Sequence, residues 1–220
     1  RPAEGGPVRI LVDFAHNEHG MSALADAVNA VGADRVILPG VGAARDAMSR
    51  LTQLDLVDVI RALTQPVLGI CLGMQLLAEA SEEEDVECLG IIPGVARKLQ
   101  GDTSCPVPNM GWCAITARQS HDVLESIDDG SYFYFVHSYA LPVSDHTLAT
   151  ANHTEPFSAM VCNENFVAAQ FHPERSSING SRLLANFVGS VELAVAIEGD
   201  LPIAVDNGHL HQRVGRGRFG

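Results

Sequence analysis

The sequence is poor in basic residues and in long apolar runs. Its 14 Lys and Arg side chains stand against 27 Asp and Glu side chains, for a net charge of -13. A nucleic-acid-binding protein needs a basic face to meet phosphates, and this composition does not predict one. No apolar run approaches the roughly 18 residues that cross a bilayer, and residues 1–6 lack the apolar segment of a signal peptide. We therefore expect neither nucleic acid nor a membrane as a partner.

Paired cysteines are also lacking. The five cysteines lie at positions 71, 88, 105, 113 and 162, and no two of them form a CxxC pair. An odd, unpaired set argues against a disulfide framework and against a cysteine zinc site. The segment from His16 to His19 does not have the HExxH spacing, so no metal is expected. This cysteine usage favours a reducing, cytoplasmic location.

The 220 residues, 46% hydrophobic and 19% charged, suit one globular domain. Apolar runs predict strands at 8–12, 34–38, 66–70, 132–136, 147–151, 158–162 and 166–171. Helical periodicity predicts helices at 21–31, 46–63, 74–80 and 181–195, with a loop over most of 99–112. Alternating strands and helices followed by a run of strands predict a three-layer α/β fold with a mixed, mostly parallel central sheet. We place the domain at 8–198 and expect flexible tails at 1–7 and 199–220.

The most informative segment runs from Gly69 to Gly73 and has Cys71 at its centre, between an expected strand and an expected helix. A G-x-nucleophile-x-G sequence in that context predicts a sharp turn that exposes the nucleophile. The helix N-terminus favours the thiolate, and the N–H of Leu72 is available to an oxyanion. The alternative is a buried structural cysteine at a tight turn, which the flanking glycines make less attractive.

His172 and Glu174 are candidates for the base and its orienting carboxylate. They follow the expected strand at 166–171, and residues two apart in an extended chain point to the same side. The carboxylate could then fix the tautomer of the ring, as in a catalytic triad. A pair at the end of a strand with no catalytic role explains the spacing equally well.

A glycine-rich turn follows the expected strand at 34–38. The segment from Pro39 to Gly42 does not fit a dinucleotide fingerprint, because Arg45 occupies the third glycine position. Such a turn could present a backbone N–H to an oxyanion. It could also be a plain connection from strand to helix.

Together these segments resemble the class I glutamine amidotransferases. The resemblance rests on 68–75 (LGICLGMQ) and 169–174 (AQFHPE), and it extends over roughly 8–187. Within that family the chain is most similar to the glutaminase subunit of imidazole glycerol phosphate synthase, an enzyme of histidine biosynthesis. The similarity to that subunit rests on the segments 38–42 (LPGVG), 108–112 (PNMGW) and 132–139 (YFYFVHSY), and on the acidic run at Glu82 and Glu83.

The resemblance implies a flavodoxin-like, three-layer fold and a Cys71–His172–Glu174 triad that releases ammonia from L-glutamine through a thioester. It implies an oxyanion site at Gly40, Val41, Gly42 and Leu72. It implies contacts to glutamine from Gly73, Gln75, Glu83, His137, Ser138 and Tyr139. Residues Asn109, Met110, Gly111 and Trp112 would form the partner interface and ammonia gate.

The partner implied by the resemblance is a (β/α)8-barrel cyclase subunit, which forms a heterodimer with this chain. The cyclase would combine the ammonia with a phosphorylated ribulosyl-formimino aminoimidazole carboxamide nucleotide. No cofactor and no metal are implied.

The chain departs from the family pattern near its N-terminus. The family carries D-x-G-x-x-N-L after the first strand, whereas Asp13 is followed here by FAHNEHG. Only Ala33 separates Gly32, at the expected helix end, from Asp34, so about one strand with its loop is missing and partner docking there is in question. Pro106 and Asn109 replace an expected lysine and histidine.

Two other functions stay open from the sequence. A γ-glutamyl hydrolase or peptidase could use the same elbow without an ammonia acceptor, although the segments at 108–112 and 132–139 argue against it. A non-catalytic binding protein could also retain these motifs after losing a docking surface near the N-terminus.

Overall fold

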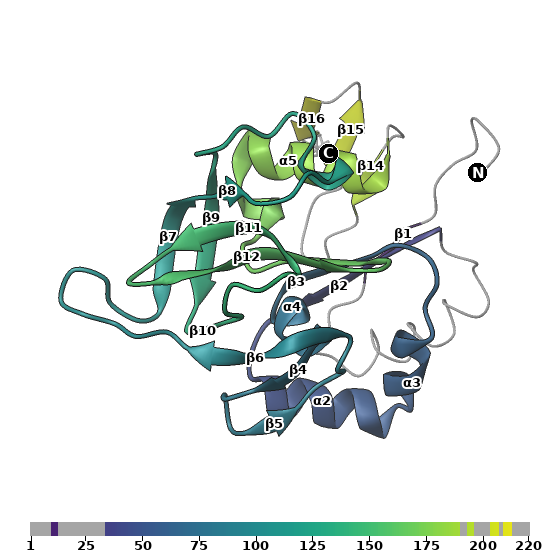
Figure 1. Ribbon diagram of the computed structural model, residues 1–220. Coiled ribbons are helices and arrows are strands. Elements are labelled where there is room, and N and C mark those ends of the chain that lie inside the picture. Colours follow the sequence, from purple (N-terminus) through teal and green to yellow (C-terminus); the bar gives the residue numbers. More distant parts are fainter. Residues whose placement is uncertain (1–9, 13–33, 190–192, 196–202, 207–208, 213–220) are drawn as a thin grey trace, which may run out of the picture.

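A seven-stranded mixed sheet lies at the centre of the computed structural model, which describes residues 10–12, 34–189, 193–195, 203–206 and 209–212 (Figure 1). Parallel pairing joins the four strands on one side of this sheet, and antiparallel pairing joins the rest. The predicted mixed sheet is confirmed, but it is not mostly parallel, because parallel pairing is confined to the half that contains the elbow. In order across the sheet, the strands are β1 (Ile10–Val12), β2 (Arg35–Gly40), β3 (Val67–Cys71), β13 (Phe166–Ala169), β12 (Pro156–Asn163), β11 (Thr147–Asn152) and β8 (Thr116–Ala117).

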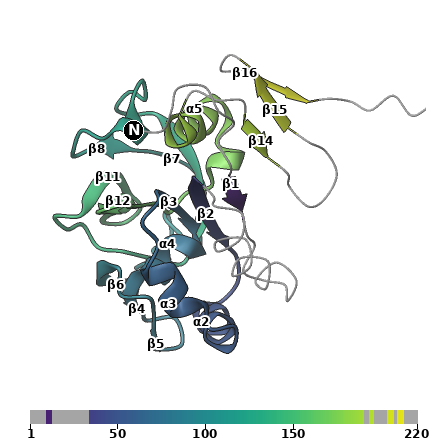
Figure 2. The same cartoon turned by 90° about the vertical axis from the view of Figure 1, so that its right-hand side faces the viewer.

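Both faces of this sheet are covered, which confirms the predicted three layers (Figure 2). One face packs against helices α2 (Ala44–Gln53), α3 (Leu56–Arg61) and α4 (Leu72–Leu77), and the other packs against α5 (Ser177–Val188). Helices can pack on both faces because successive side chains of a strand point to opposite faces, and the buried strands carry apolar residues at both sets of positions. In β13, Phe166 and Ala168 join one core, whereas Val167 and Ala169 join the other.

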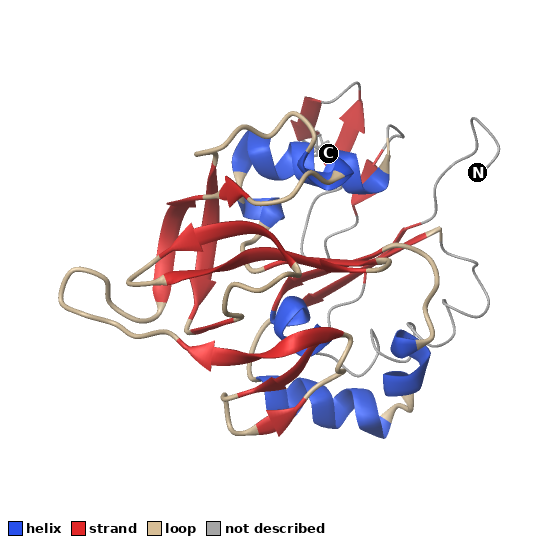
Figure 3. Ribbon diagram, in the orientation of Figure 1, coloured by secondary structure: helices blue, strands red, loops and turns tan. Residues whose placement is uncertain are grey.

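Smaller sheets and turns complete the layers (Figure 3). A four-stranded sheet lies on the face that carries α2, and an antiparallel pair of strands, β7 and β9, lies on the face that carries α5. The remaining elements are β4 (Ala78–Ser81), β5 (Val86–Glu87), β6 (Ile92–Lys98), β10 (Tyr139–Ala140), β7 (Asn109–Ala114), β9 (Tyr132–His137), β14 (Leu193–Val195), β15 (Ile203–Asp206), β16 (His209–Gln212) and the 3₁₀ turns η1 (Asp122–Leu124) and η2 (Pro173–Arg175).

Two of the predicted helices were wrong in extent. The helix expected at 46–63 is divided into α2 and α3 at Asp55, whose left-handed φ of 56° interrupts the helical path. The helix expected at 181–195 begins earlier and ends at Val188, because Gly189 takes a φ of 76° and closes it. Short-range periodicity indicated helix in both cases, but it did not reveal where the backbone leaves the helix.

The bounds of other predicted elements also differ from the structure, and some predictions lie outside the described residues. The helix expected at 74–80 starts directly after Cys71 and gives way to β4 at Ala78. The loop expected up to Trp112 ends earlier, because β7 begins at Asn109. The helix expected at 21–31, and the question of a missing strand, lie outside the described residues. β15 and β16 lie within 203–212, where the sequence predicts a flexible tail, and the domain limits of 8–198 stay a prediction. No helix among the described residues is long and apolar enough to span a bilayer.

Candidate active site

Cys71 occupies the turn between β3 and α4 in a strained backbone conformation. Its φ of 54° and ψ of -109° lie outside the usual regions for a residue with a side chain. Such an outlier costs about 1–3 kcal/mol and persists only where the surrounding packing holds it. The nucleophile elbow predicted from the sequence therefore has the backbone geometry of one.

The two elbow glycines are explained by close packing. A Cβ on Gly73 would lie 1.9 Å from the carbonyl oxygen of Leu38 in β2, and one on Gly69 would lie 2.8 Å from a methyl group of Leu77. Any side chain at these positions would force α4 away from β2 and β3. The glycines thus let the helix N-terminus sit directly on the strand ends beside Cys71.

His172 follows β13 and is joined to Glu174. The ring Nδ1 lies 2.7 Å from Glu174 Oε1, and the peptide N–H of His172 donates to the carbonyl of Tyr134 over 2.9 Å. Ser176 donates to the His172 carbonyl over 2.6 Å. The pairing of ring and carboxylate was expected from an extended chain, but the turn η2 makes it instead. Because Nδ1 is occupied, Nε2 is the ring atom left for chemistry.

His172 is positively charged at neutral pH. Burial lowers the pKa of His172, but the thiol of Cys71 and the carboxylate of Glu174 outweigh burial and raise it to about 10. Nε2 is buried and has no hydrogen-bond partner among the described residues. At neutral pH the ring therefore carries its proton, as a donor to a leaving group must.

The turn at residues 40–43 begins at the end of β2 next to the elbow and contains the predicted oxyanion residues 40–42, so we call it the oxyanion turn. Gly40 pairs with Cys71 across the β2–β3 ladder, and a Cβ on Gly40 would lie 3.0 Å from the Leu72 Cβ. Gly42 has a φ of 99°, and the Val41 side chain is 55% exposed. The predicted residues Gly40 and Leu72 are thus brought together with Cys71, whereas Val41 faces outward.

Gln75 and Gln170 form a buried amide pair beside the elbow. The Gln75 amide donates to the carbonyl of Tyr139 over 3.1 Å and to Gln170 Oε1 over 3.2 Å. Gln170 Nε2 lies 3.9 Å from Cys71 Sγ. Sequence reasoning missed Gln170, although its place two residues before His172 on the same extended segment was a usable signal.

His137 is buried and neutral. Its Nδ1 lies 2.9 Å from the carbonyl of Tyr139, so this nitrogen donates, and Nε2 accepts from the Asn109 amide over 3.1 Å. Burial is the main reason why its pKa falls to about 4. Both ring nitrogens are thus occupied, which makes His137 unsuited to act as the base. Asn109 was expected at the partner interface, but its side chain is buried against His137 and does not reach the surface.

The other predicted residues lie at two different places. Met110 and Trp112 of β7 are 65% and 50% exposed, and Gly111 between them has a φ of 144°. Ser138 lies between β9 and β10, and its carbonyl accepts from the N–H of Leu99 over 2.9 Å, whereas Tyr139 begins β10.

Glu83 lies in the β4–β5 turn, and its carboxylate accepts from the N–H of Ala44 over 3.0 Å. Ser176 was missed in the sequence and is buried. Its hydroxyl accepts from the N–H of Tyr134 over 2.9 Å, which fixes the turn η2 to β9.

Three of the other cysteines have raised pKa values, which makes them poorer nucleophiles at neutral pH. Burial raises the pKa of Cys88 to about 11, and burial also raises the pKa values of Cys113 and Cys162. Among the residues that the structure describes, no three His, Cys, Asp or Glu side chains gather as metal ligands do.

Comparison with known proteins places this geometry in a family. The sequence pattern of the family described as "Glutamine amidotransferase class-I" matches residues 8–191. Among solved structures, a glutamine amidotransferase from Thermotoga maritima matches with a TM-score of 0.54 and 17% identity, over 82% of each chain. A second structure, titled as a glutamine amidotransferase, matches with a TM-score of 0.55 and 14% identity over 80% of this chain and 96% of the other. These structures support the fold alone.

Sequence relatives are much closer. Imidazole glycerol phosphate synthase subunit HisH 2 of Legionella pneumophila (strain Lens) is 50% identical over 163 residues, 74% of this chain and 82% of the relative. The subunit HisH of Escherichia coli O157:H7 is 50% identical over 157 residues, 71% of this chain and 80% of the relative. The subunit HisH of Vibrio cholerae is 47% identical over 165 residues, which are 72% of this chain and 80% of the relative. The chain therefore belongs to the class I glutamine amidotransferase family and, within it, to the HisH subunits of imidazole glycerol phosphate synthase.

Proposed function

We propose that Cys71, His172 and Glu174 form the triad with which this chain hydrolyses L-glutamine. The observation that carries the proposal is a cysteine held at φ 54° near a histidine whose Nδ1 is bonded to a carboxylate and whose pKa that cysteine helps to raise. A backbone strain of that size is retained where a side chain must be presented to a substrate.

The chemistry follows from the charge states. The Cys71 thiolate attacks the side-chain amide carbon of glutamine, and the carbonyl oxygen takes up the negative charge. His172 donates the proton of Nε2 to the leaving nitrogen, so that ammonia departs and a thioester remains. The neutral ring then takes a proton from water, which attacks the thioester and releases glutamate. Glu174 holds the ring by its Nδ1–H and stabilises its positive charge throughout.

The oxyanion is proposed to bind between the N–H of Leu72 and residues 40–42 of the oxyanion turn. Gly40 is the neighbour of Cys71 across the ladder, which brings the turn next to the residue that carries the sulfur. A turn with a φ of 99° at Gly42 can reorient a peptide more readily than a turn of bulkier residues. Each such donor contributes on the order of 10² to 10³ in rate.

The glutamine itself is proposed to lie against Gly73, Gln75, Glu83, His137, Ser138 and Tyr139. The Gln75 amide donates to Tyr139 and Gln170, and its carbonyl oxygen is left to accept from a substrate N–H. Glu83 supplies the negative charge that suits the ammonium group of an amino acid.

A partner is proposed to dock on the face around Trp112. Large apolar side chains are exposed there on β7 and β9, whereas most other aromatic side chains among the described residues are buried. Trp112 meets Tyr134 edge to face, with ring centroids 6.1 Å apart, and Arg175 of the catalytic turn lies 4.6 Å from the Tyr134 ring centre. A (β/α)8-barrel cyclase subunit that covers this face would receive the ammonia next to the triad.

Glutamate release by the purified chain tests the proposal, measured alone and after addition of the cyclase subunit with its nucleotide ligand. We expect a low rate alone and a higher rate in the complex, and we expect Cys71→Ala to abolish both. Activity in the complex that depends on glutamine but survives in Cys71→Ala would rule out the triad. A folded chain that is inactive in both conditions would favour a non-catalytic role.

A further inference from the structure

The β4–β5 turn, residues 82–85, has the sequence Glu-Glu-Glu-Asp and contains no glycine. Glu84 and Asp85 nevertheless take left-handed φ values of 59° and 52°. Two consecutive residues with side chains in that region are strained, and adjacent carboxylates repel one another. Contacts from outside the turn must therefore hold its shape.

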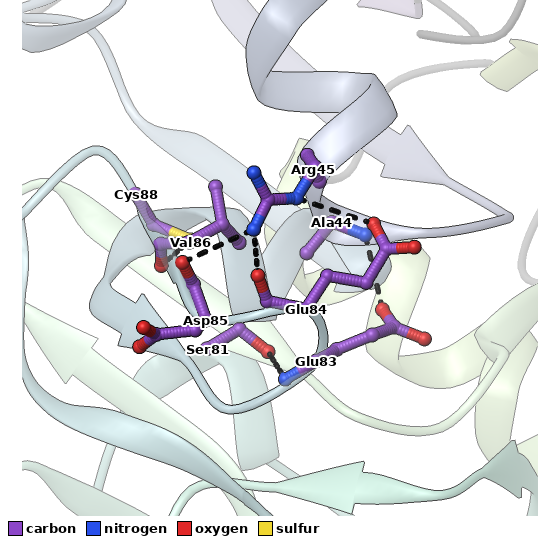
Figure 4. Close-up of polar contacts among 8 residues, drawn as sticks. All are labelled: Ala44, Arg45, Ser81, Glu83, Glu84, Asp85, Val86 and Cys88. Carbon is purple, nitrogen blue, oxygen red and sulfur yellow. Dashed lines mark hydrogen bonds and ion pairs between the residues drawn. The ribbon is translucent and has the colours of Figure 1, made fainter.

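Arg45 of α2 provides such contacts (Figure 4). Its guanidinium donates to the carbonyl of Glu84 and, over 3.4 Å, to the carbonyl of Asp85. Its Nε also lies 3.6 Å from the Glu84 carboxylate. One side chain thus binds both strained residues of the turn and offsets part of their charge.

The turn in return supports the start of α2. Ala43 occupies the N-cap position and has no side chain that could accept a hydrogen bond. The N–H of Ala44 instead donates to the Glu83 carboxylate over 3.0 Å, across 39 positions in the sequence. Ala44 is fully buried and directly follows the oxyanion turn, so this bond fixes the point where that turn enters the helix.

We infer that Arg45 is a positioning residue, which holds Glu83 and the oxyanion turn at a fixed separation. The inference rests on the proposed function, in which Glu83 faces the substrate ammonium and the turn at 40–42 faces the oxyanion. The residues proposed to bind the two ends of the glutamine molecule are then held together through Arg45 and the β4–β5 turn. Loss of Arg45 loosens the β4–β5 turn, which shifts Glu83 and releases the Ala44 N–H together.

This role differs from that of a surface ion pair. The side chains of Arg45 and Glu84 are 55% and 52% exposed, and an exposed pair adds little to global stability. Arg45→Ala should consequently leave the melting temperature nearly unchanged while it impairs the use of glutamine. Arg45→Lys retains the charge and can reach one carbonyl, so we expect partial recovery.

Arg61 of α3 provides a matched control. Its side chain is 47% exposed, it donates to the carbonyl of Leu89 over 2.8 Å, and it lies 3.7 Å from Asp58. Arg61→Ala therefore removes a comparable set of contacts, none of which involves the oxyanion turn or Glu83.

The experiment compares two reagents that alkylate Cys71 in the full chain. Iodoacetamide reports the reactivity of the thiolate alone, whereas a chloroketone analogue of glutamine must also be bound and oriented. For Arg45→Ala we expect the chloroketone rate to fall on the order of tenfold, less than the loss of an oxyanion donor. The iodoacetamide rate should stay within about twofold of wild type, because Cys71 and His172 are unchanged.

Each outcome decides the question. A chloroketone rate that is unchanged in Arg45→Ala, or that falls equally in Arg61→Ala, would overturn the inference and leave the proposed function standing. Equal losses with both reagents would assign Arg45 a purely structural role and also overturn it. If wild-type Cys71 reacts with iodoacetamide but not with the chloroketone, the proposed glutamine site itself is wrong, and the inference is rejected with it.

Discussion

Replacement of Gly73 by alanine tests whether the elbow depends on close packing. The added Cβ would lie 1.9 Å from the Leu38 carbonyl oxygen, against the 3.0 Å below which real Cβ atoms are essentially never found. The difference, 3.0 − 1.9 = 1.1 Å, is the least distance by which α4 or β2 must move. A misplacement of about 1 Å at reacting groups can cost on the order of 10² in rate. We therefore expect kcat/KM for glutamine to fall about 10²-fold.

The expected loss of stability is smaller. Overpacking costs about 1–3 kcal/mol, and alanine recovers about 1 kcal/mol of helix propensity relative to glycine. The net cost of about 0–2 kcal/mol corresponds to a decrease in melting temperature of up to about 8 °C for a domain of this size. Glutamate release and thermal unfolding measure the two effects separately.

Gly130→Ala serves as the control for this prediction. Gly130 has a φ of 83° and open space where a Cβ would go, so alanine adds backbone strain without a clash. It should be destabilising by about 1–2 kcal/mol and should leave kcat/KM unchanged in the folded protein. The packing argument for the elbow is refuted if Gly73→Ala retains wild-type activity, or if the two variants lose activity equally.

Three further predictions concern the triad, the partner surface and pH. Glu174→Gln leaves an oxygen that accepts from Nδ1 but removes the negative charge. The pKa of His172 should then fall below about 10, and the alkaline limb of the pH profile of glutamine hydrolysis should move to lower pH. An alkaline limb at the same pH as in wild type would contradict the assignment. Trp112→Ala with Met110→Ser should weaken binding of the cyclase subunit by about tenfold or more, with chloroketone labelling of the isolated chain unchanged; binding equal to that of wild type would exclude this surface. Because the folded pKa of His137 is lowered to about 4 from 6.5, the free energy of unfolding should decrease as the pH falls from about 6.5 toward 4, and His137→Gln should flatten this dependence in thermal unfolding at a series of pH values.

The sequence predicted best those features that depend on neighbouring residues. The strand before Cys71 and its glycines form a local motif, and His172 with Glu174 needs only two residues of separation. Buried strands such as β13 were also recognised, because continuous apolar runs are typical of strands covered on both faces.

Features that depend on distant pairing were missed or misplaced. The contact of Gln170 with Gln75 joins positions 95 residues apart, and no local pattern encodes it. The burial of Asn109 is set by the register of β7 against β9, where Asn109 pairs with His137. The interruption at Asp55 depends on packing of α3 beneath the sheet, which overrides a continuous apolar periodicity.

The central claim is that Cys71 carries the glutamyl group during hydrolysis. The most direct measurement is mass spectrometry of the protein quenched in acid during turnover of glutamine, in the presence of the cyclase subunit. The account predicts a glutamyl adduct on the peptide that contains Cys71, together with glutamate release, and neither in Cys71→Ala. Glutamate release without any adduct at Cys71, or undiminished release by Cys71→Ala, would contradict it.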